Sequence, residues 1–272
     1  MINSVNIGNF SLHFYSLCIL LGVIFAYLII MKESKKQKIN PDVMFNIIFW
    51  GLLLGIIGAR LYYVLFNFEY YVFHMDEIIK VWNGGLAIHG GIIVGLIVVY
   101  FYSIKRNLSF LKLTDIIIPG VILAQAFGRW GNFFNQEAFG MMVSKELLQK
   151  LLVPNFVIKG MYIDGAYFLP TFYFESILCL IGFIIMLIIR NKTKKSGYVT
   201  AFYLIWYGLV RFIIEYYRTD SLMLFNAKVA MIVSGLMFIF GILLIVYIKR
   251  YRNIRSKEWY YDFFRKNKRR SI

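Results

Sequence analysis

Long apolar runs alternate with short polar links along the whole chain of 272 residues. Crossing a bilayer as a helix takes about 20 apolar residues, and seven of the runs come close to that length. The expected spans are residues 12–31, 43–66, 84–104, 115–135, 171–190, 198–217 and 228–248. The pattern therefore predicts an all-α, polytopic membrane protein with seven transmembrane helices.

One link is long. Residues 136–170 carry mixed charge and apolar clusters, which is compatible with a small exofacial head between helices four and five. No repeat or linker rich in serine and proline divides the chain. We expect one transmembrane domain over residues 1–248, followed by a basic, aromatic tail over residues 249–272.

Composition supports the membrane assignment. Apolar residues make up 60% of the chain and charged residues 16%, which excludes a soluble enzyme, a disordered chain and a disulfide scaffold. Cys18 and Cys179 lie inside apolar runs, and we interpret them as small apolar packing residues. No grouping of histidine, aspartate and cysteine predicts a metal site, and no glycine loop of the phosphate-binding kind is present, so no cofactor is expected.

The basic residues predict the orientation. Of the 30 lysines and arginines, 21 fall in links 32–42, 105–112 and 190–197 and in the tail. Because basic loops stay in the cytoplasm, we expect the N-terminus outside and the C-terminus inside. The net charge of +16 is then mainly a topology signal, and no nucleic-acid partner is expected. The tail is expected to lie on the cytoplasmic leaflet.

Ionisable residues inside the spans need an explanation, because each costs about 2.5–3.5 kcal/mol on the insertion scale. With a rise of about 1.5 Å per residue, most of them fall within about 10 Å of the predicted outer boundary. These residues are Arg60, His89, Arg129, Glu175, Arg211 and Glu215, together with Tyr15. A site opening to the outer leaflet is therefore predicted. Asp115 is instead expected at a helix start, in a structural role.

Helical spacing places Tyr207, Arg211, Glu215 and Arg218 on one stripe. Arg211 and Glu215 are expected to pair along the helix. On its own, this stripe fits a structural ion pair between helices as well as a binding site.

The segment Gly128–Gly140 is richer in hydrogen-bonding groups. Arg129, Asn132 and Gln136 share a predicted helical face, and Gly128 and Gly131 are expected to permit close backbone approach. The planar fork of arginine matches phosphate oxygens two at a time. We interpret this segment as a binding site for an anion with several acceptor oxygens.

Glycine pairs bracket His89 on both sides, at Gly84–Gly85 and Gly90–Gly91. The segment taken alone fits a packing histidine and a substrate path equally well. Glycines 51, 55 and 58, with Gly91 and Gly95, are typical of closely packed helix faces.

These segments together resemble the prolipoprotein diacylglyceryl transferases, over most of the chain. Gly128–Gly140 looks like the family signature, Gly84–Gly91 like its histidine motif, and Tyr207–Arg218 like its Tyr-Gly-x-x-Arg-Phe-x-x-Glu motif. Gly58–Tyr63 and His13–Tyr15 are shorter agreements. The chain departs from the family's His-Pro-Thr-x-Leu-Tyr-Glu pattern, with Leu169 in place of the histidine and Phe174 in place of the tyrosine.

The resemblance implies transfer of a diacylglyceryl group from phosphatidylglycerol to the lipobox cysteine thiol of a bacterial prolipoprotein. The product is a thioether, and glycerol phosphate leaves. The implied partners are phosphatidylglycerol, a prolipoprotein signal peptide and membrane lipid, in the bacterial cytoplasmic membrane. The implied catalytic residues are His89, Arg129, Arg211 and Glu215. The implied substrate-binding residues are Tyr15, Arg60, Asn132, Asn135, Glu137, Gly140, Tyr207 and Arg218.

The residue types suit that reaction. A free thiol has a pKa of about 8.5, so the attacking sulfur needs a base or a cationic setting. A departing phosphate needs charge stabilisation. Our hypothesis assigns Arg129 and Arg211 to the phosphate. In it, Asn132 and Glu137 orient the headgroup, His89 is the base or its relay, Glu215 positions Arg211, and Tyr15 gates or aligns the lipid. The final proton acceptor stays open.

Two other readings remain. A lipid or anion transporter also needs arginines inside a bundle, although it more often shows repeated halves. A non-catalytic paralogue that binds lipid or signal peptide is the other, and Leu169 is the residue that favours it.

Overall fold

The computed structural model describes residues 4–7, 10–193, 195–221, 223–224 and 227–251. Seven helices in these ranges are long and apolar enough to cross a membrane, which confirms the predicted number of spans. They are α1 (Phe14–Lys36), α2 (Pro41–Phe66), α4 (Ile88–Lys105), α5 (Phe110–Asn135), α8 (Thr171–Lys192), α9 (Tyr198–Tyr217) and α10 (Val229–Tyr251).

Two helices begin four or five residues away from their predicted starts. The span expected from residue 84 begins at Ile88, because Gly84 and Gly85 have φ angles of 85° and 68°, outside the helical region. Helix α5 begins at Phe110, five residues earlier than expected. Asp115 is therefore inside the helix and 1% exposed, not at its first turn.

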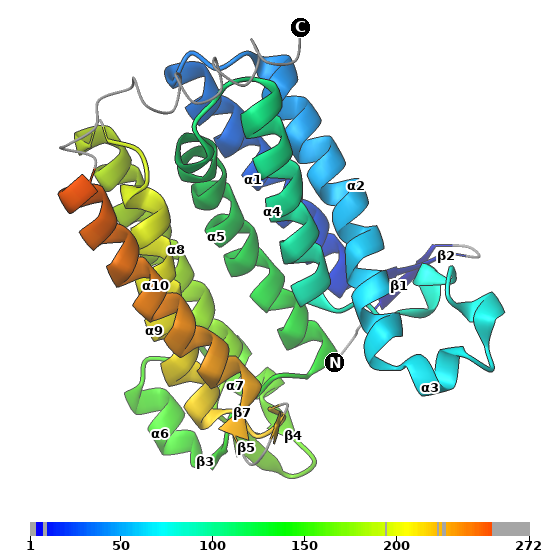
Figure 1. Ribbon diagram of the computed structural model, residues 1–272. Helices are drawn as coiled ribbons and strands as arrows, with labels where there is room; N and C mark the ends of the chain where they lie inside the picture. The colour runs from blue at the N-terminus through cyan, green and yellow to red at the C-terminus, as the bar shows by residue number, and fades with distance from the viewer. Residues whose placement is uncertain (1–3, 8–9, 194, 222, 225–226, 252–272) are drawn as a thin grey trace, which may run out of the picture. The chain divides into compact units, whose positions relative to one another are not determined.

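The chain forms two compact units, residues 1–25 with 121–272 and residues 26–120. We call them the first and second unit. In the second unit, α2 packs on α4 through glycines (Figure 1). A Cβ atom on Gly58 would meet the Gly90 carbonyl at 2.9 Å, and one on Gly91 would meet the Gly55 carbonyl at 3.2 Å. The predicted close packing is confirmed at these positions, whereas Gly51 and Gly95 have no neighbour within 4 Å among the described residues.

Short elements join α2 to α4 in the second unit. They are α3 (Phe68–Tyr71), a 3-10 helix at Met75–Glu77 and another at Val81–Asn83. We call residues 67–87 the arm. The core of this unit lies further along the helices, around the fully buried Met44, Leu113 and Ile116.

In the first unit, α9 lies between α8 and α10 in contact with both (Figure 1). Gly208 of α9 brings the backbones close, since a Cβ there would lie 2.8 Å from the Ser234 carbonyl. The indole nitrogen of Trp206 donates to the Leu178 carbonyl of α8 at 2.9 Å.

The predicted head at residues 136–170 is a small folded segment of the first unit. Its elements are β3 (Met142–Val143), α6 (Lys145–Lys150), α7 (Asn155–Gly160), β4 (Tyr162–Ile163) and β5 (Ala166–Phe168). The strands form an antiparallel sheet in the order β3-β5-β4. Leu148, Val157, Met161 and Phe172 form its buried core.

Two hairpins of the first unit were not predicted. Strands β1 (Ser4–Ile7) and β2 (Phe10–His13) pair directly before α1, so the first span starts at residue 14 rather than 12. Strands β6 (Met223–Leu224) and β7 (Ala227–Lys228) pair between α9 and α10.

The helices leave much of their apolar surface uncovered by protein. Between 11% and 50% of the residues in the apolar window of each spanning helix are buried within the protein, so most of that surface needs a lipid solvent. The chain is a multi-pass membrane protein. Its orientation stays a prediction, and the predicted tail lies outside the described residues beyond residue 251.

Candidate functional site

Two buried carboxylates organise the polar cluster of the first unit. Glu175 lies one turn into α8 and is 1% exposed, and Glu215 lies in the last turn of α9 and is 2% exposed. Burying a carboxylate is unfavourable unless it is paired and hydrogen-bonded. Both are paired with arginines.

Glu175 joins two arginines from two other helices. Its Oε1 lies 2.8 Å from Nη2 of Arg129 on α5, and its Oε2 lies 3.1 Å from Nη1 of Arg211 on α9. The Tyr207 hydroxyl donates to Glu175 Oε1 at 3.2 Å and accepts from Arg129 Nη2 at 3.4 Å. The two arginines predicted to bind phosphate are thus brought together on one carboxylate.

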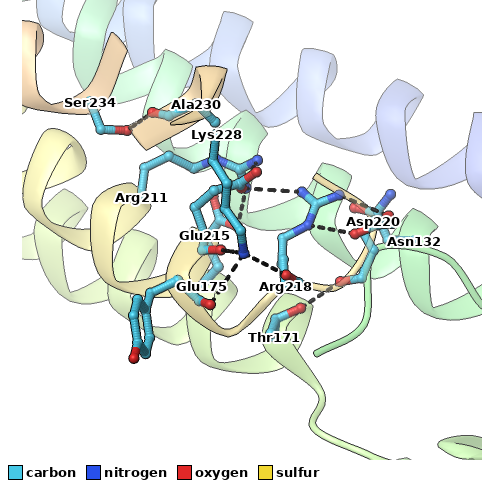
Figure 2. Close-up of polar contacts among 12 residues, drawn as sticks. Asn132, Thr171, Glu175, Arg211, Glu215, Arg218, Asp220, Lys228, Ala230 and Ser234 are labelled. Atoms are coloured by element: carbon cyan, nitrogen blue, oxygen red, sulfur yellow. Dashed lines mark hydrogen bonds and ion pairs between the residues drawn. The ribbon is translucent and has the colours of Figure 1, made fainter. Parts of the chain in front are cut away.

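The chain of alternating charges continues past the end of α9 (Figure 2). Arg211 Nη2 lies 2.6 Å from Glu215 Oε2, which confirms the predicted pair along the helix. That oxygen has no well-aligned hydrogen bond, so we treat the contact as an ion pair and not as a directed hydrogen bond. Arg218 Nη1 lies 3.8 Å from the same oxygen.

Arg218 also binds Asp220 in a two-point contact. Its Nε and Nη2 each donate to a separate oxygen of the Asp220 carboxylate at 2.9 Å. Partial burial acts to raise the pKa of Asp220, but the hydrogen bonds and the charge of Arg218, together with backbone hydrogen bonds, hold the pKa below its usual value.

The two glutamates of the cluster are more buried than the arginines that pair with them. The carboxylate side chains of Glu175 and Glu215 are 2% and 3% exposed, whereas those of Arg129, Arg211 and Arg218 are 20%, 15% and 13% exposed. The side chains of these three arginines are therefore more exposed than those of the two glutamates, whereas the side chain of Asp220, which pairs with Arg218, is 46% exposed. Such an arrangement can bind an anion.

Amide groups flank Arg129 at the end of α5. Arg129 Nη1 donates to Asn132 Oδ1 at 3.5 Å, and Asn132 donates to Glu137 Oε1 at 2.8 Å. Asn135 reaches the same Glu137 oxygen at 3.5 Å. The predicted segment is therefore connected from Arg129 to Glu137 by side-chain hydrogen bonds.

Gln136 does not share the face of Arg129 and Asn132, so that expectation was wrong. Helix α5 ends at Asn135, and Gln136 has a φ of 50°. Its amide points to the head segment instead and donates to the Gly160 carbonyl at 3.2 Å.

Gly140 joins three segments through its backbone. Its amide donates to the Leu169 carbonyl at 2.8 Å, and it forms a β-bridge with Arg218. A Cβ atom at Gly140 would lie 3.0 Å from both Leu169 Cβ and Thr171 Cγ2, so no larger residue fits without movement.

Leu169, where the sequence departs from the family pattern, packs against the apolar core of the head segment, and so does Phe174.

Tyr15 packs on α5 at a position that requires glycine. A Cβ atom on Gly131 would lie 2.6 Å from Cδ2 of the Tyr15 ring. The structure thus places Tyr15 against α5 two residues from Arg129 along the chain.

Lys228 caps the end of α9. Its ammonium donates to the backbone carbonyls of Glu215 at 2.7 Å, Tyr216 at 3.2 Å and Arg218 at 2.7 Å (Figure 2). The last carbonyls of a helix lack partners within it, and a cation there also complements the helix dipole. The backbone that carries the side chains of Glu215 and Arg218 is thereby held in place.

Arg60 and His89 belong to the second unit. Arg60 is 5% exposed and donates to the carbonyls of Glu77, Ile78, Gly84 and Gly85 at 2.6–3.0 Å. His89 lies in the first turn of α4, with its ring 6.1 Å from that of Tyr62 on α2. The contacts of Arg60 support a positioning role, and its assignment to substrate stays a prediction.

Glu175 was predicted to lie near the outer boundary with the other charged residues, but neither it nor Lys228 was given a role at the site. Glu175 was recognised as an unusual charge inside a span, which was the available signal. Lys228 looked like an ordinary link residue.

The comparisons with known proteins agree with these motifs. A family described as "Prolipoprotein diacylglyceryl transferase" matches residues 3–247. A Streptococcus uberis protein named phosphatidylglycerol–prolipoprotein diacylglyceryl transferase is 46% identical over 253 residues, covering 92% of this chain and 96% of its own. A Streptococcus pyogenes serotype M5 protein of the same name is 44% identical over 258 residues, covering 93% and 98%. With this match extending through every spanning helix, the chain belongs to the prolipoprotein diacylglyceryl transferase family.

Proposed function

We propose that this protein transfers the diacylglyceryl group of phosphatidylglycerol to the lipobox cysteine thiol of prolipoproteins. The observation that carries the proposal is the pairing of Arg129 and Arg211 on Glu175, with both arginine side chains more exposed than that of Glu175. The names of the Streptococcus relatives support the same reaction.

The reaction exchanges one bond for another. The bond between the glycerol carbon of the diacylglyceryl group and the phosphate oxygen breaks, and a carbon–sulfur bond forms. The thiol proton is lost, and glycerol phosphate leaves with the electron pair of the broken bond. Negative charge therefore develops on the phosphate oxygen, where pre-positioned cations are most effective.

In this proposal, Arg129 and Arg211 bind the phosphate of the lipid. Glu175 and Glu215 position them. The Tyr207 hydroxyl is hydrogen-bonded to both Arg129 and Glu175 and so holds these two side chains in place. Because each guanidinium has five N–H donors, the contacts to the carboxylates leave donors for a phosphate.

The remaining residues act around the phosphate. Asn132, Asn135 and Glu137 orient the glycerol headgroup by hydrogen bonds. Tyr15 aligns the lipid, and Gly140 with Arg218 shapes the edge near the head segment. His89 is the base for the thiol or its relay, and Arg60 supports the segment that leads to His89.

The proposed partners are phosphatidylglycerol, the signal peptide of a prolipoprotein with its lipobox cysteine, and bulk membrane lipid. The proposed location is the bacterial cytoplasmic membrane, with the cluster near its outer leaflet. Residues 1–248 form the proposed transferase domain, and residues 249–272 the cytoplasmic tail.

Mass spectrometry tests the proposal directly. The purified protein is incubated with phosphatidylglycerol and a lipobox peptide, and the peptide is weighed. A gain of one diacylglyceryl group is expected, together with release of glycerol phosphate. A peptide with serine in place of cysteine is the matched control and should gain nothing.

The same experiment separates the alternatives. A transporter would move lipid between leaflets without changing the peptide mass. A non-catalytic paralogue would bind the peptide and leave its mass unchanged. Either result contradicts the transferase proposal.

A further inference from the structure

The arm, residues 67–87 of the second unit, exposes an unusual number of large apolar side chains. Phe73 is 84% exposed, Ile79 75%, Trp82 74% and Met75 68%. Several large apolar side chains exposed in one short segment indicate an interaction site, because water is a poor solvent for them. We call these four residues the apolar crown.

Contacts of Arg60 hold the backbone of the arm that carries the crown. Arg60 donates to four carbonyls of the arm, those of Glu77, Ile78, Gly84 and Gly85. Its guanidinium also lies over the ring of Tyr71, 5.3 Å from the centroid. Since these contacts fix the arm at its middle and near its C-terminal end, the exposure of the crown is a feature of the fold.

The polar side chains of the arm bind one another. Lys80 pairs with Asp76 at 2.6 Å, and the Tyr70 hydroxyl donates to Glu77 at 3.0 Å. With Glu69, the arm carries three carboxylates and one lysine. A segment with this excess of negative charge is not drawn to anionic lipid by electrostatics, so any attachment depends on its apolar residues.

The position of the arm indicates what covers the crown. It follows Phe66, the last residue of α2, and precedes Ile88, the first residue of α4, and both helices are apolar enough to span a membrane. Phe66 is 74% exposed and Ile88 is 70% exposed. The lipid-facing surface of these helices therefore continues directly onto the arm.

We propose that the arm lies in the headgroup region of the bilayer, with Phe73, Met75, Ile79 and Trp82 inserted toward the acyl chains. The ion pair of Asp76 with Lys80 and the carboxylate of Glu77 then remain at the aqueous side. Tryptophan favours this depth because its ring is apolar and its N–H is polar. Short amphipathic segments bind interfaces in the same way.

Site-directed fluorescence tests the insertion. Cys18 and Cys179 are free and are replaced by serine to give a cysteine-free background. Phe73→Cys and Ile79→Cys are labelled with bimane, and Asp76→Cys on the same arm is the matched control. Each protein is reconstituted in phosphatidylcholine–phosphatidylglycerol vesicles that carry a nitroxide lipid quencher, or is exposed to aqueous iodide.

Labels at positions 73 and 79 should be quenched severalfold more by the nitroxide lipid than by iodide, and the label at position 76 the reverse. Iodide access at 73 and 79 without lipid quenching would overturn the proposal. So would shielding from both quenchers, since that result means that another protein chain or a second copy covers the crown.

A second measurement uses the native side chain. Quenching of intrinsic fluorescence by brominated lipid is compared between the unmodified protein and Trp82→Phe. If Trp82 is inserted, its removal lowers the quenched fraction; an unchanged fraction contradicts insertion. Equal elution volumes and unfolding temperatures of the variants show that the fold is intact.

Discussion

Arg129 on α5 and Arg211 on α9 contact opposite oxygens of one carboxylate, that of Glu175 on α8. Residues 46 and 36 positions apart from Glu175 along the chain are thereby drawn into a single cluster. Three helices are joined at this point by charge, at a depth where uncompensated charge is strongly unfavourable. The cluster therefore joins the helices, and under the proposed function it also binds the lipid phosphate; the first two predictions separate these two roles.

Replacing Arg129 should remove transfer while leaving the fold. We expect Arg129→Ala to lower the initial rate of thioether formation on the order of 100- to 1000-fold, because one charge donor to the phosphate is lost. Arg129→Lys should recover little, since a single ammonium does not reproduce the two-point fork. The measurement is peptide mass against time. Arg106→Ala, at an exposed helix end, is the control and should keep full activity.

Glu175→Gln keeps the side-chain volume and removes the charge that joins the arginines. We expect a loss of about 3–5 kcal/mol of stability, as when one partner of a buried ion pair is removed. Misplacement of the arginines should also lower kcat, on the order of 100-fold. Thermal unfolding and steady-state kinetics measure the two effects. Glu69→Gln, which is exposed, should change neither, and normal kinetics in Glu175→Gln would contradict the positioning role.

Removing the cap on α9 should weaken the fold locally. Lys228→Met leaves the carbonyls of Glu215, Tyr216 and Arg218 without their donor, which we expect to cost about 1–3 kcal/mol. Hydrogen exchange should rise first at the end of α9. Lys145→Met, at an exposed position of the head segment, is matched in residue type and should stay within about 0.5 kcal/mol. Equal effects of the two substitutions would argue against the cap.

Two glycines of α5 should differ sharply in their tolerance of alanine. Gly131→Ala brings a Cβ within 2.6 Å of the Tyr15 ring, whereas Gly128→Ala meets no described atom within 4 Å. We expect overpacking to cost about 1–3 kcal/mol at Gly131. At Gly128, better helix propensity should leave stability unchanged or raise it by up to about 1 kcal/mol. Unfolding temperatures of the two variants compare them directly, and the reverse order would contradict the packing described.

Acid should selectively weaken the contact of Arg218 with Asp220. Because the folded protein lowers the pKa of Asp220, this carboxylate contributes stability above its unfolded pKa of about 4, and the contribution is lost as pH falls through the lower, folded value. Asp220→Asn lacks this dependence. The difference in unfolding temperature between the two proteins should therefore be largest near neutral pH and should shrink toward about pH 3. A constant difference would contradict the assignment.

Periodicity along one helix was enough to predict contacts within that helix. The hydropathy pattern gave the seven spans, and the helical repeat gave the Arg211–Glu215 pair and the neighbourhood of Arg129 and Asn132. These predictions succeed because the spacing of residues in a helix depends on local geometry alone.

Contacts between helices could not be predicted in this way. Nothing in the spacing of Glu175 indicates that it faces both α5 and α9, since that depends on how the helices are rotated and shifted against each other. The carbonyls capped by Lys228 lie across a hairpin of two-residue strands, which carries too weak a pattern to detect. The prediction that Gln136 shares the face of Arg129 was wrong for a related reason, because the helix ends one residue before Gln136.

The cluster contains three arginines and three carboxylates among the described residues: Arg129, Arg211 and Arg218 with Glu175, Glu215 and Asp220. Under the proposed function, its neutrality bears on turnover as well as on binding. Arginines without carboxylate partners would bind the product glycerol phosphate as tightly as they bind the lipid phosphate. Because each arginine can pair again with a carboxylate of the cluster, that carboxylate replaces glycerol phosphate as the product leaves. The next lipid can then bind.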